Sequence, residues 1–230
     1  MERNENNYLE QRVTLATHTI KTFGWMFFGL MVTFVLAYTS YSTGFIFNIL
    51  SIPSILYILP LAEILLVIVL SARIYKLPVA ATHALFFVYA VLNGLTFSVY
   101  FLIYNLASMI YVFAITSGMF GAMALYGFFT KSDLSKWKTV LFFGLIALVV
   151  FWVVAMFINL SAFETIACSI GVLIFVGFTA YDTQKIKLCY EAYYNDPEML
   201  EKVSIYSALQ IYLDFINLFI YLLRLFGRRK

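Results

Sequence analysis

The chain has 230 residues, of which 63% are hydrophobic and 12% are charged, and its formal net charge is +3. A soluble domain of average composition has roughly 45–50% apolar and ~25% charged residues. This composition therefore excludes an ordinary soluble globule and places the chain in a lipid bilayer. So small a net charge gives no argument for nucleic-acid binding, and two cysteines are too few for a disulfide framework or a metal cluster.

Uncharged intervals divide the chain into membrane spans, because a charged side chain at the centre of a bilayer costs about 2.5–3.5 kcal/mol. A helical crossing needs ~20 apolar residues. The intervals predict seven transmembrane helices, near 21–38, 54–72, 79–103, 107–129, 139–159, 163–185 and 203–226. We therefore predict an all-α membrane protein with a single membrane domain over 21–226, a polar N-terminal segment over 1–20 and a basic tail over 227–230.

Basic residues gather in alternate loops. They precede the first expected helix, and they lie between the second and third, the fourth and fifth, and the sixth and seventh. Because such loops stay in the cytoplasm, we expect a cytoplasmic N-terminus, and the short N-terminal segment favours a bacterial cell membrane. The tail breaks the pattern. A full final crossing places it outside, whereas a re-entrant helix keeps it inside, and the length of 203–223 favours the full crossing.

Four ionisable residues lie within or at the ends of the expected helices: Glu63, Arg73, Asp182 and Asp214. Carboxylates inside a membrane face a cavity or a partner rather than lipid. Asp214 is near the middle of its span and is the hardest to explain as an interfacial group. For Glu63 the alternative is a partnered structural carboxylate, for Asp182 a solvated helix end, and for Arg73 a side chain that reaches the cytoplasmic interface.

The last expected helix carries a polar stripe. At 100° per residue, its members share one side of the helix: Ser207, Gln210, Asp214, Asn217 and Tyr221. A helix with such a stripe must turn it toward protein or water, so we expect this helix to be central, with six helices around it. The stripe either lines a path for something small and hydrophilic or forms a seam of interhelical hydrogen bonds.

Small residues four positions apart predict close helix packing. They occur as Ser117 with Gly121, Gly118 with Ala122, and Ala167 with Gly171. The chain has no glycine-rich phosphate loop, no metal-ligand spacing of His and Cys and no nucleophile elbow. We therefore expect neither an enzyme nor a bound cofactor.

Three segments resemble the Bax inhibitor-1 family of multi-pass membrane proteins. They are Gly177-Phe-Thr-Ala-Tyr-Asp-Thr-Gln-Lys-Ile186, the stretch from Ser207 to Arg224, and Tyr126-Gly-Phe-Phe-Thr-Lys-Ser-Asp-Leu134. The resemblance covers the chain from about residue 20. It implies a seven-helix bundle with the last helix at its centre, and an aspartate pair at Asp182 and Asp214. It also implies that Arg73 pairs with these aspartates in a closed state.

The resemblance further implies a pH-dependent calcium leak and, in bacterial members, modulation of a membrane protease. Two carboxylates forced together in a medium of low dielectric constant cannot both ionise cheaply, so one retains a proton and the pair titrates as a unit. When both are charged, Asp182 and Asp214 offer oxygen ligands suited to calcium. The other residues expected to line the path are Glu63, Ser207, Gln210 and Asn217. The segment from Lys187 to Lys202, read as a loop, looks longer than in several relatives, which leaves the relative depth of the two aspartates open.

The expected partners are therefore the lipid bilayer, calcium and protons, and a membrane protease or another membrane protein. A non-conducting regulator that binds such a protein is the main alternative. An intramembrane aspartyl protease is more remote: Tyr181-Asp182 and Asp214 mimic its layout, but Ile211-Tyr-Leu-Asp214 lacks the Gly-x-Gly-Asp sequence that such enzymes need. A proton-coupled transporter is a further alternative that no internal repeat supports.

Overall fold

The computed structural model describes residues 13–230, and the regular secondary structure in this range is helical. The helices are α2 (Leu15–Ser42), α3 (Phe45–Leu50), α4 (Ile55–Arg73), α5 (Val79–Ile103), α6 (Leu106–Phe129), α7 (Lys138–Ala155), α8 (Glu164–Tyr193) and α9 (Pro197–Phe226), with short 3₁₀ turns η1 (Leu134–Trp137) and η2 (Ser161–Phe163). Seven of them are long and apolar enough to cross a membrane. The predicted all-α, seven-span fold class is confirmed.

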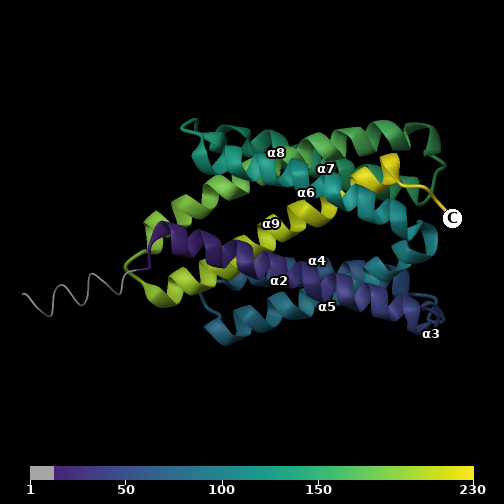
Figure 1. Ribbon diagram of the computed structural model, residues 1–230, viewed down its shortest axis with the longest axis horizontal. Helices are drawn as coiled ribbons and strands as arrows, with labels where there is room; N and C mark the ends of the chain where they lie inside the picture. The colour runs from purple at the N-terminus through teal and green to yellow at the C-terminus, as the bar shows by residue number, and fades with distance from the viewer. Residues whose placement is uncertain (1–12) are drawn as a thin grey trace, which may run out of the picture.

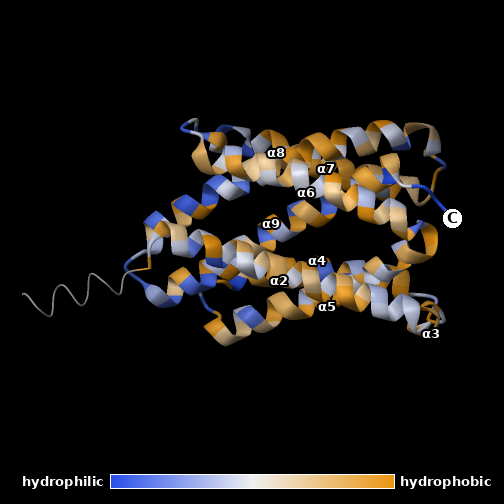
Figure 2. Cartoon of the chain, in the orientation of Figure 1, coloured by the Kyte–Doolittle hydropathy of each residue, from blue (hydrophilic) through white to orange (hydrophobic). Residues whose placement is uncertain are grey.

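The bundle has two outer layers and a helix between them. In Figure 1, α6, α7 and α8 form the upper layer, α2, α4 and α5 form the lower layer, and α9 runs between the two. Large apolar side chains are exposed along the helices, as at Phe143, Leu173 and Tyr111, and residues coloured as hydrophobic recur along the helices in Figure 2. Exposed apolar surface of this extent marks the face that meets lipid.

The last helix is the most buried of the seven spans. It packs against α2, α5, α6 and α8, whereas α4 packs against α5 and α3, and α7 packs chiefly against α8. The expected ring of six helices around the last one is therefore not confirmed in that form. α4 and α7 take outer positions.

The segment read as a loop, from Lys187 to Lys202, is almost entirely helical. α8 continues to Tyr193 and α9 begins at Pro197, so only 194–196 separate them. The side chain of Asp196 accepts a hydrogen bond from the Met199 amide, and proline occupies the first turn. Asp followed by Pro is a strong helix start, and the loop interpretation overlooked this local signal because it followed the charges alone.

The first span also begins earlier than expected, at Leu15 rather than near residue 21. The hydroxyl of Thr14 accepts a hydrogen bond from the Thr17 amide and caps this helix. His18 and Thr22 are buried, and the Thr22 hydroxyl lies 3.0 Å from that of Ser204 in α9. The helix extends because packing against α9 buries its first turns. The rest of the predicted N-terminal segment, residues 1–12, lies outside the described residues.

The loops predicted to be cytoplasmic lie together at one end of the bundle. Tyr190 near the end of α8 donates to the carbonyl of Val13, and Tyr193 donates to Tyr75 in the loop between α4 and α5. At the other end, the Nζ of Lys230 donates to the hydroxyl of Tyr41, close to the end of α2. α9 therefore runs the full length of the bundle and leaves the basic tail opposite the start of α2, as the full-crossing prediction required. Which end faces the cytoplasm stays a prediction.

One predicted pattern of small residues does not pack as expected. A Cβ placed at Gly118 or Gly121 of α6 would have no heavy atom within 4 Å among the described neighbours. At Gly171 of α8, by contrast, a Cβ would lie 2.7 Å from the ring of Tyr221. The small residues of α8 contact α9, whereas Gly118 and Gly121 turn away from the other helices, because spacing alone does not say which side of a helix meets a neighbour.

Candidate functional site

Helices α8 and α9 lie side by side and antiparallel, and two contacts set their register. Gly171 of α8 adjoins the ring of Tyr221 of α9. Further along, the Nζ of Lys185 donates to Oε1 of Gln210 over 3.0 Å. From the first contact to the second, residue numbers rise along α8 and fall along α9. The segments between the two contacts, 172–184 of α8 and 211–220 of α9, therefore run beside each other.

Asp182 and Asp214 both lie between these contacts, one on each helix, and we call them the aspartate pair. Both are buried, with relative exposures of 6% and 4%, and the charge of Asp182 acts on the carboxyl group of Asp214. One oxygen of each, Oδ1 of Asp182 and Oδ2 of Asp214, is buried and has no hydrogen-bond partner within residues 13–230. Buried carboxylates without partners are costly, so this arrangement favours a shared proton or a bound water or cation.

The backbone beside Asp182 is tightly enclosed by α6. A Cβ at Gly127 would overlap the carbonyl oxygen of Ala180, two residues before Asp182 on α8. Glycine at this position lets the two helix backbones meet. The aspartate pair is therefore held by α9 on one side of α8, while α6 fixes α8 on another.

Lys185 is a cation associated with the pair, and it was not among the predicted site residues. Its charge acts on both Asp182 and Asp214, and its ammonium also lies 5.2 Å from the centre of the Tyr206 ring. Lys185 lies three positions after Asp182, so the two share a face of α8. That spacing could have predicted Lys185 as a neighbour of Asp182, but the charge pattern assigned this lysine to a loop.

Arg73 is not brought to the pair. It ends α4 on an exposed surface, and it makes no ion pair with any described carboxylate. α4 packs against α5 and α3, away from the seam between α8 and α9. In this conformation Lys185 takes the place beside the pair that the resemblance assigned to Arg73.

The polar stripe of α9 is largely turned toward α8. Ser207 is buried near Cys189, and Gln210 accepts from Lys185. Tyr221 accepts a hydrogen bond from the indole of Trp152 in α7 over 3.1 Å. Asn217 differs, because its amide donates to the carbonyl of Leu213 within α9 itself. The stripe thus forms an interhelical seam with the aspartate pair near its middle.

Glu63 lies in a separate polar network on the other side of α9. Its oxygens accept hydrogen bonds from Thr96 (2.6 Å) and Asn93 (3.3 Å) of α5. The hydroxyl of Tyr212 in α9 donates to Oδ1 of Asn93 over 3.1 Å and lies 2.6 Å from the hydroxyl of Thr33 in α2. These bonds make Glu63 a partnered carboxylate that ties α4 and α5 to α9. Its predicted role in lining the path stays a prediction.

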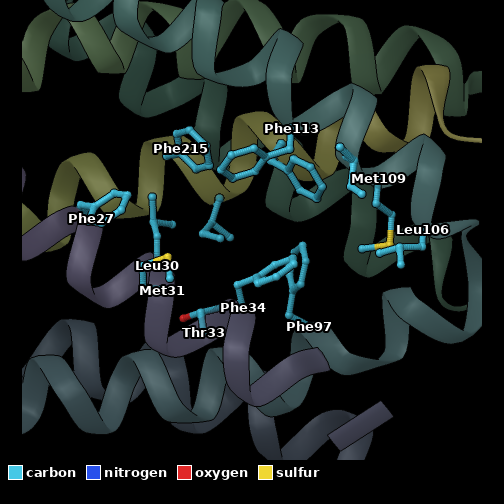
Figure 3. Close-up of a pocket in the computed structure, with 13 residues that line it drawn as sticks. Phe27, Leu30, Met31, Thr33, Phe34, Phe97, Leu106, Met109, Phe113 and Phe215 are labelled. Atoms are coloured by element: carbon cyan, nitrogen blue, oxygen red, sulfur yellow. The ribbon is translucent and has the colours of Figure 1, made fainter. Parts of the chain in front are cut away.

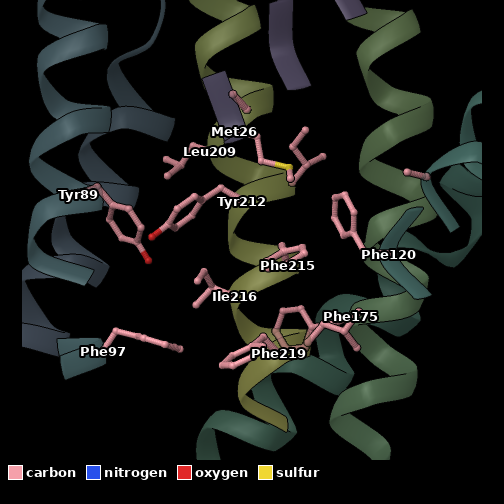
Figure 4. Packing of buried hydrophobic residues seen from close by; sticks show 14 of the residues in the cluster. Met26, Tyr89, Phe97, Phe120, Phe175, Leu209, Tyr212, Phe215, Ile216 and Phe219 are labelled. Carbon is pink, nitrogen blue, oxygen red and sulfur yellow. The ribbon is translucent and has the colours of Figure 1, made fainter. Parts of the chain in front are cut away.

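Tyr212 is the centre of this network, and its ring is fully buried against that of Tyr89 (Figure 4). Tyr212→Phe is expected to lower the unfolding free energy by about 1 kcal/mol, because hydrogen bonds between membrane helices contribute ~0.6 and at most ~1.7 kcal/mol each. The measurement is detergent unfolding followed by tryptophan fluorescence. Tyr111→Phe, on an exposed surface of α6, is the control and should change little; equal losses in both variants would contradict a structural role for the network.

The aspartate pair does not by itself make a resident metal site. No group of three or more His, Cys, Asp and Glu side chains in residues 13–230 is arranged to hold a metal ion. Calcium prefers six to eight oxygen ligands, and two carboxylates supply too few. An ion at this point would need water or backbone oxygens as further ligands, which suits a passing ion better than a tightly held one.

Comparison with known proteins places the chain in a family. A family model described as "Inhibitor of apoptosis-promoting Bax1" matches residues 15–230. The inner membrane protein YbhL of Escherichia coli (strain K12) is 42% identical over 227 residues, covering 98% of this chain and 97% of that protein. Uncharacterized proteins of Deinococcus radiodurans and Borreliella burgdorferi are 39% and 36% identical, over 94% and 91% of this chain and 92% and 91% of their own lengths. On this match over nearly its whole length, the chain belongs to the Bax inhibitor-1 family of multi-pass membrane proteins.

Proposed function

We propose that this protein is a pH-sensitive leak pathway for calcium or a similar cation across the cell membrane. The proposal is that protonation of the aspartate pair sets whether the seam between α8 and α9 is closed. The observation that supports it is the burial of two carboxylates, each with an unpartnered oxygen, between the two longest helices of the bundle. The location rests on the relative in Escherichia coli, which is an inner membrane protein.

A proton shared by Asp182 and Asp214 removes the repulsion between them and lets α8 and α9 remain in contact. Loss of that proton leaves two negative charges in a medium of low dielectric constant, where their repulsion is poorly screened. The helices then separate or admit a cation, and carboxylate oxygens are the ligands that calcium prefers. Ser207 and Gln210, on the same face of α9, are proposed to offer further oxygens along the path.

Lys185 is proposed to moderate this response. Its ammonium already binds Gln210 and acts on both aspartates, so it partly neutralises a deprotonated pair. A direct role for Arg73 would need a second conformation in which the end of α4 approaches α8 and α9. We therefore propose that Lys185 rather than Arg73 is the cation that stabilises the deprotonated pair.

The test is calcium flux into liposomes that contain the purified protein, measured across pH for wild type, Asp182→Asn and Asp214→Asn. Asparagine keeps the shape of the side chain and cannot titrate, so each variant is expected to lose most of the pH dependence. Glu191→Gln is the matched control, because Glu191 is an exposed carboxylate near the end of the same helix, and it should keep the wild-type profile.

Identical pH profiles in wild type and both aspartate variants would remove the mechanism. Protein that is folded yet silent in all flux assays, and that captures a membrane protease or channel, would favour the non-conducting regulator instead. Cleavage of a transmembrane peptide that disappears in Asp214→Asn would revive the protease alternative. Each result points to a different class of function, so the experiment separates them.

A further inference from the structure

An apolar slit opens on the bundle surface between α2 and α6, and neither aspartate of the pair lines it. Although both helices pack against α9, they do not form a main packing pair with each other. They meet edge to face through Phe23 and Phe120, whose ring centres are 6.5 Å apart. From that contact toward the end of α2, the slit has a volume of about 280 Å³.

Side chains of α2, α5, α6 and α9 line the slit, and Figure 3 shows them, with Phe97 coming from α5. α2 supplies one wall, α6 the other, and α9 the floor. All the lining side chains except Thr33 are apolar. Residues at the mouth are widely exposed, including Phe27 at 62% and Ile110 at 59%. In a membrane this mouth faces the acyl chains of lipids, which can fill the slit.

Cationic groups stand at one end of this slit. Beyond its Leu106 end, the backbone N–H of Lys230 donates to the carbonyl of Ile103, and the carbonyl of Arg228 accepts from the amide of Asn105, so the tail crosses the turn between α5 and α6. The Nζ of Lys230 donates to the hydroxyl of Tyr41, near the end of α2. The tail therefore spans the end of α2 and the start of α6, where Arg228 lines a separate hollow with Ser108 and Tyr111 of α6.

These two cations carry charge that no described carboxylate neutralises. The ion pairs at this end of the bundle join Glu164 to Arg224 and Arg229, while Arg228 and Lys230 have none within residues 13–230. Lys230 uses two of its three N–H donors, on the hydroxyl of Tyr41 and the carbonyl of Phe101. One donor of Lys230 and the exposed guanidinium of Arg228 remain for an anion.

We propose that the slit and the tail together form a binding site for an anionic phospholipid. One acyl chain lies in the slit against α9, and the phosphate group lies over the start of α6, bound by Lys230 from one side and by Arg228 from the neighbouring hollow. The apolar slit alone would accept any lipid, and the two free cations supply the preference for negative charge. The argument for this site does not use the aspartate pair, so its test does not depend on the outcome of the leak experiment.

The test is native mass spectrometry of delipidated protein titrated with phosphatidylglycerol or with phosphatidylcholine of the same acyl chains. Wild type is expected to bind one phosphatidylglycerol roughly tenfold more tightly than phosphatidylcholine, since each basic residue contributes modestly to anionic lipid binding. The double variant Arg228→Gln/Lys230→Gln should lose that preference. The matched control, Lys131→Gln/Lys136→Gln, removes two exposed charges at the opposite end and should keep it.

A second pair of variants tests the slit. Ile110→Trp and Met31→Trp, from opposite walls, should each weaken the binding of both lipids severalfold, whereas Leu125→Trp, exposed on α6 but outside the slit, should not. Using two walls keeps the test valid if one variant fails to fold. Equal affinity of wild type for the two lipids would overturn the headgroup site. Equal weakening by Leu125→Trp and the slit variants would overturn the acyl-chain site.

Discussion

Gly127→Ala is expected to destabilise this protein more than alanine at any other glycine of α6. The added Cβ would overlap the carbonyl oxygen of Ala180 on α8. A backbone carbonyl cannot rotate away as a side chain can, so the two helices must separate along their contact. Overpacking typically lowers the unfolding free energy by about 1–3 kcal/mol. Because the obstacle here is backbone, we expect Gly127→Ala to lower it by about 3 kcal/mol or more.

The measurement is the midpoint of thermal unfolding in detergent, followed by size-exclusion chromatography. Gly118→Ala and Gly121→Ala are matched controls on the same helix, because an added Cβ there meets no described atom within 4 Å. Alanine is also the better helix former by about 1 kcal/mol, so these variants should be neutral or slightly more stable. Equal losses at Gly127 and Gly121 would contradict the close contact between α6 and α8.

Lys185→Met is expected to move the pH midpoint of cation flux to higher pH by about one unit. A positive charge beside a carboxylate favours its ionised form. Without the ammonium, Asp182 and Asp214 hold their shared proton to a higher pH, and any change in flux that depends on that proton moves in the same direction. This holds whether acid opens or closes the path, because only the midpoint is compared.

The measurement is the same liposome flux assay, with Lys187→Met as the control. Lys187 is on the same helix, but its Nζ donates to the carbonyl of Phe128 in α6. Its variant should keep the wild-type midpoint. A midpoint that stays in place in Lys185→Met, or that moves to lower pH, would show that Lys185 does not control the pair.

The site was only partly predictable. Asp214 was identified because a carboxylate in the middle of an apolar span is expensive wherever it points, and its polar neighbours fell on one side of α9. The pairing with Asp182 came from the family resemblance, and both residues are buried in the stretch where α8 and α9 pack together. Lys185 was overlooked, and Arg73 was expected in its place, because the cation that lies nearest depends on how distant helices are rotated and where they end.

The sequence by itself determined the class of protein, the seven spans, the grouping of basic loops and the acidic residues that need shielding. These follow from the cost of moving each residue into lipid, which is a local quantity that can be summed along the chain. Only the tertiary structure decided that Gly127 rather than Gly121 meets α8, that α4 and α7 lie outside, and that a slit separates α2 from α6. Such features depend on which faces of separate helices meet, and no single stretch of sequence contains that relation.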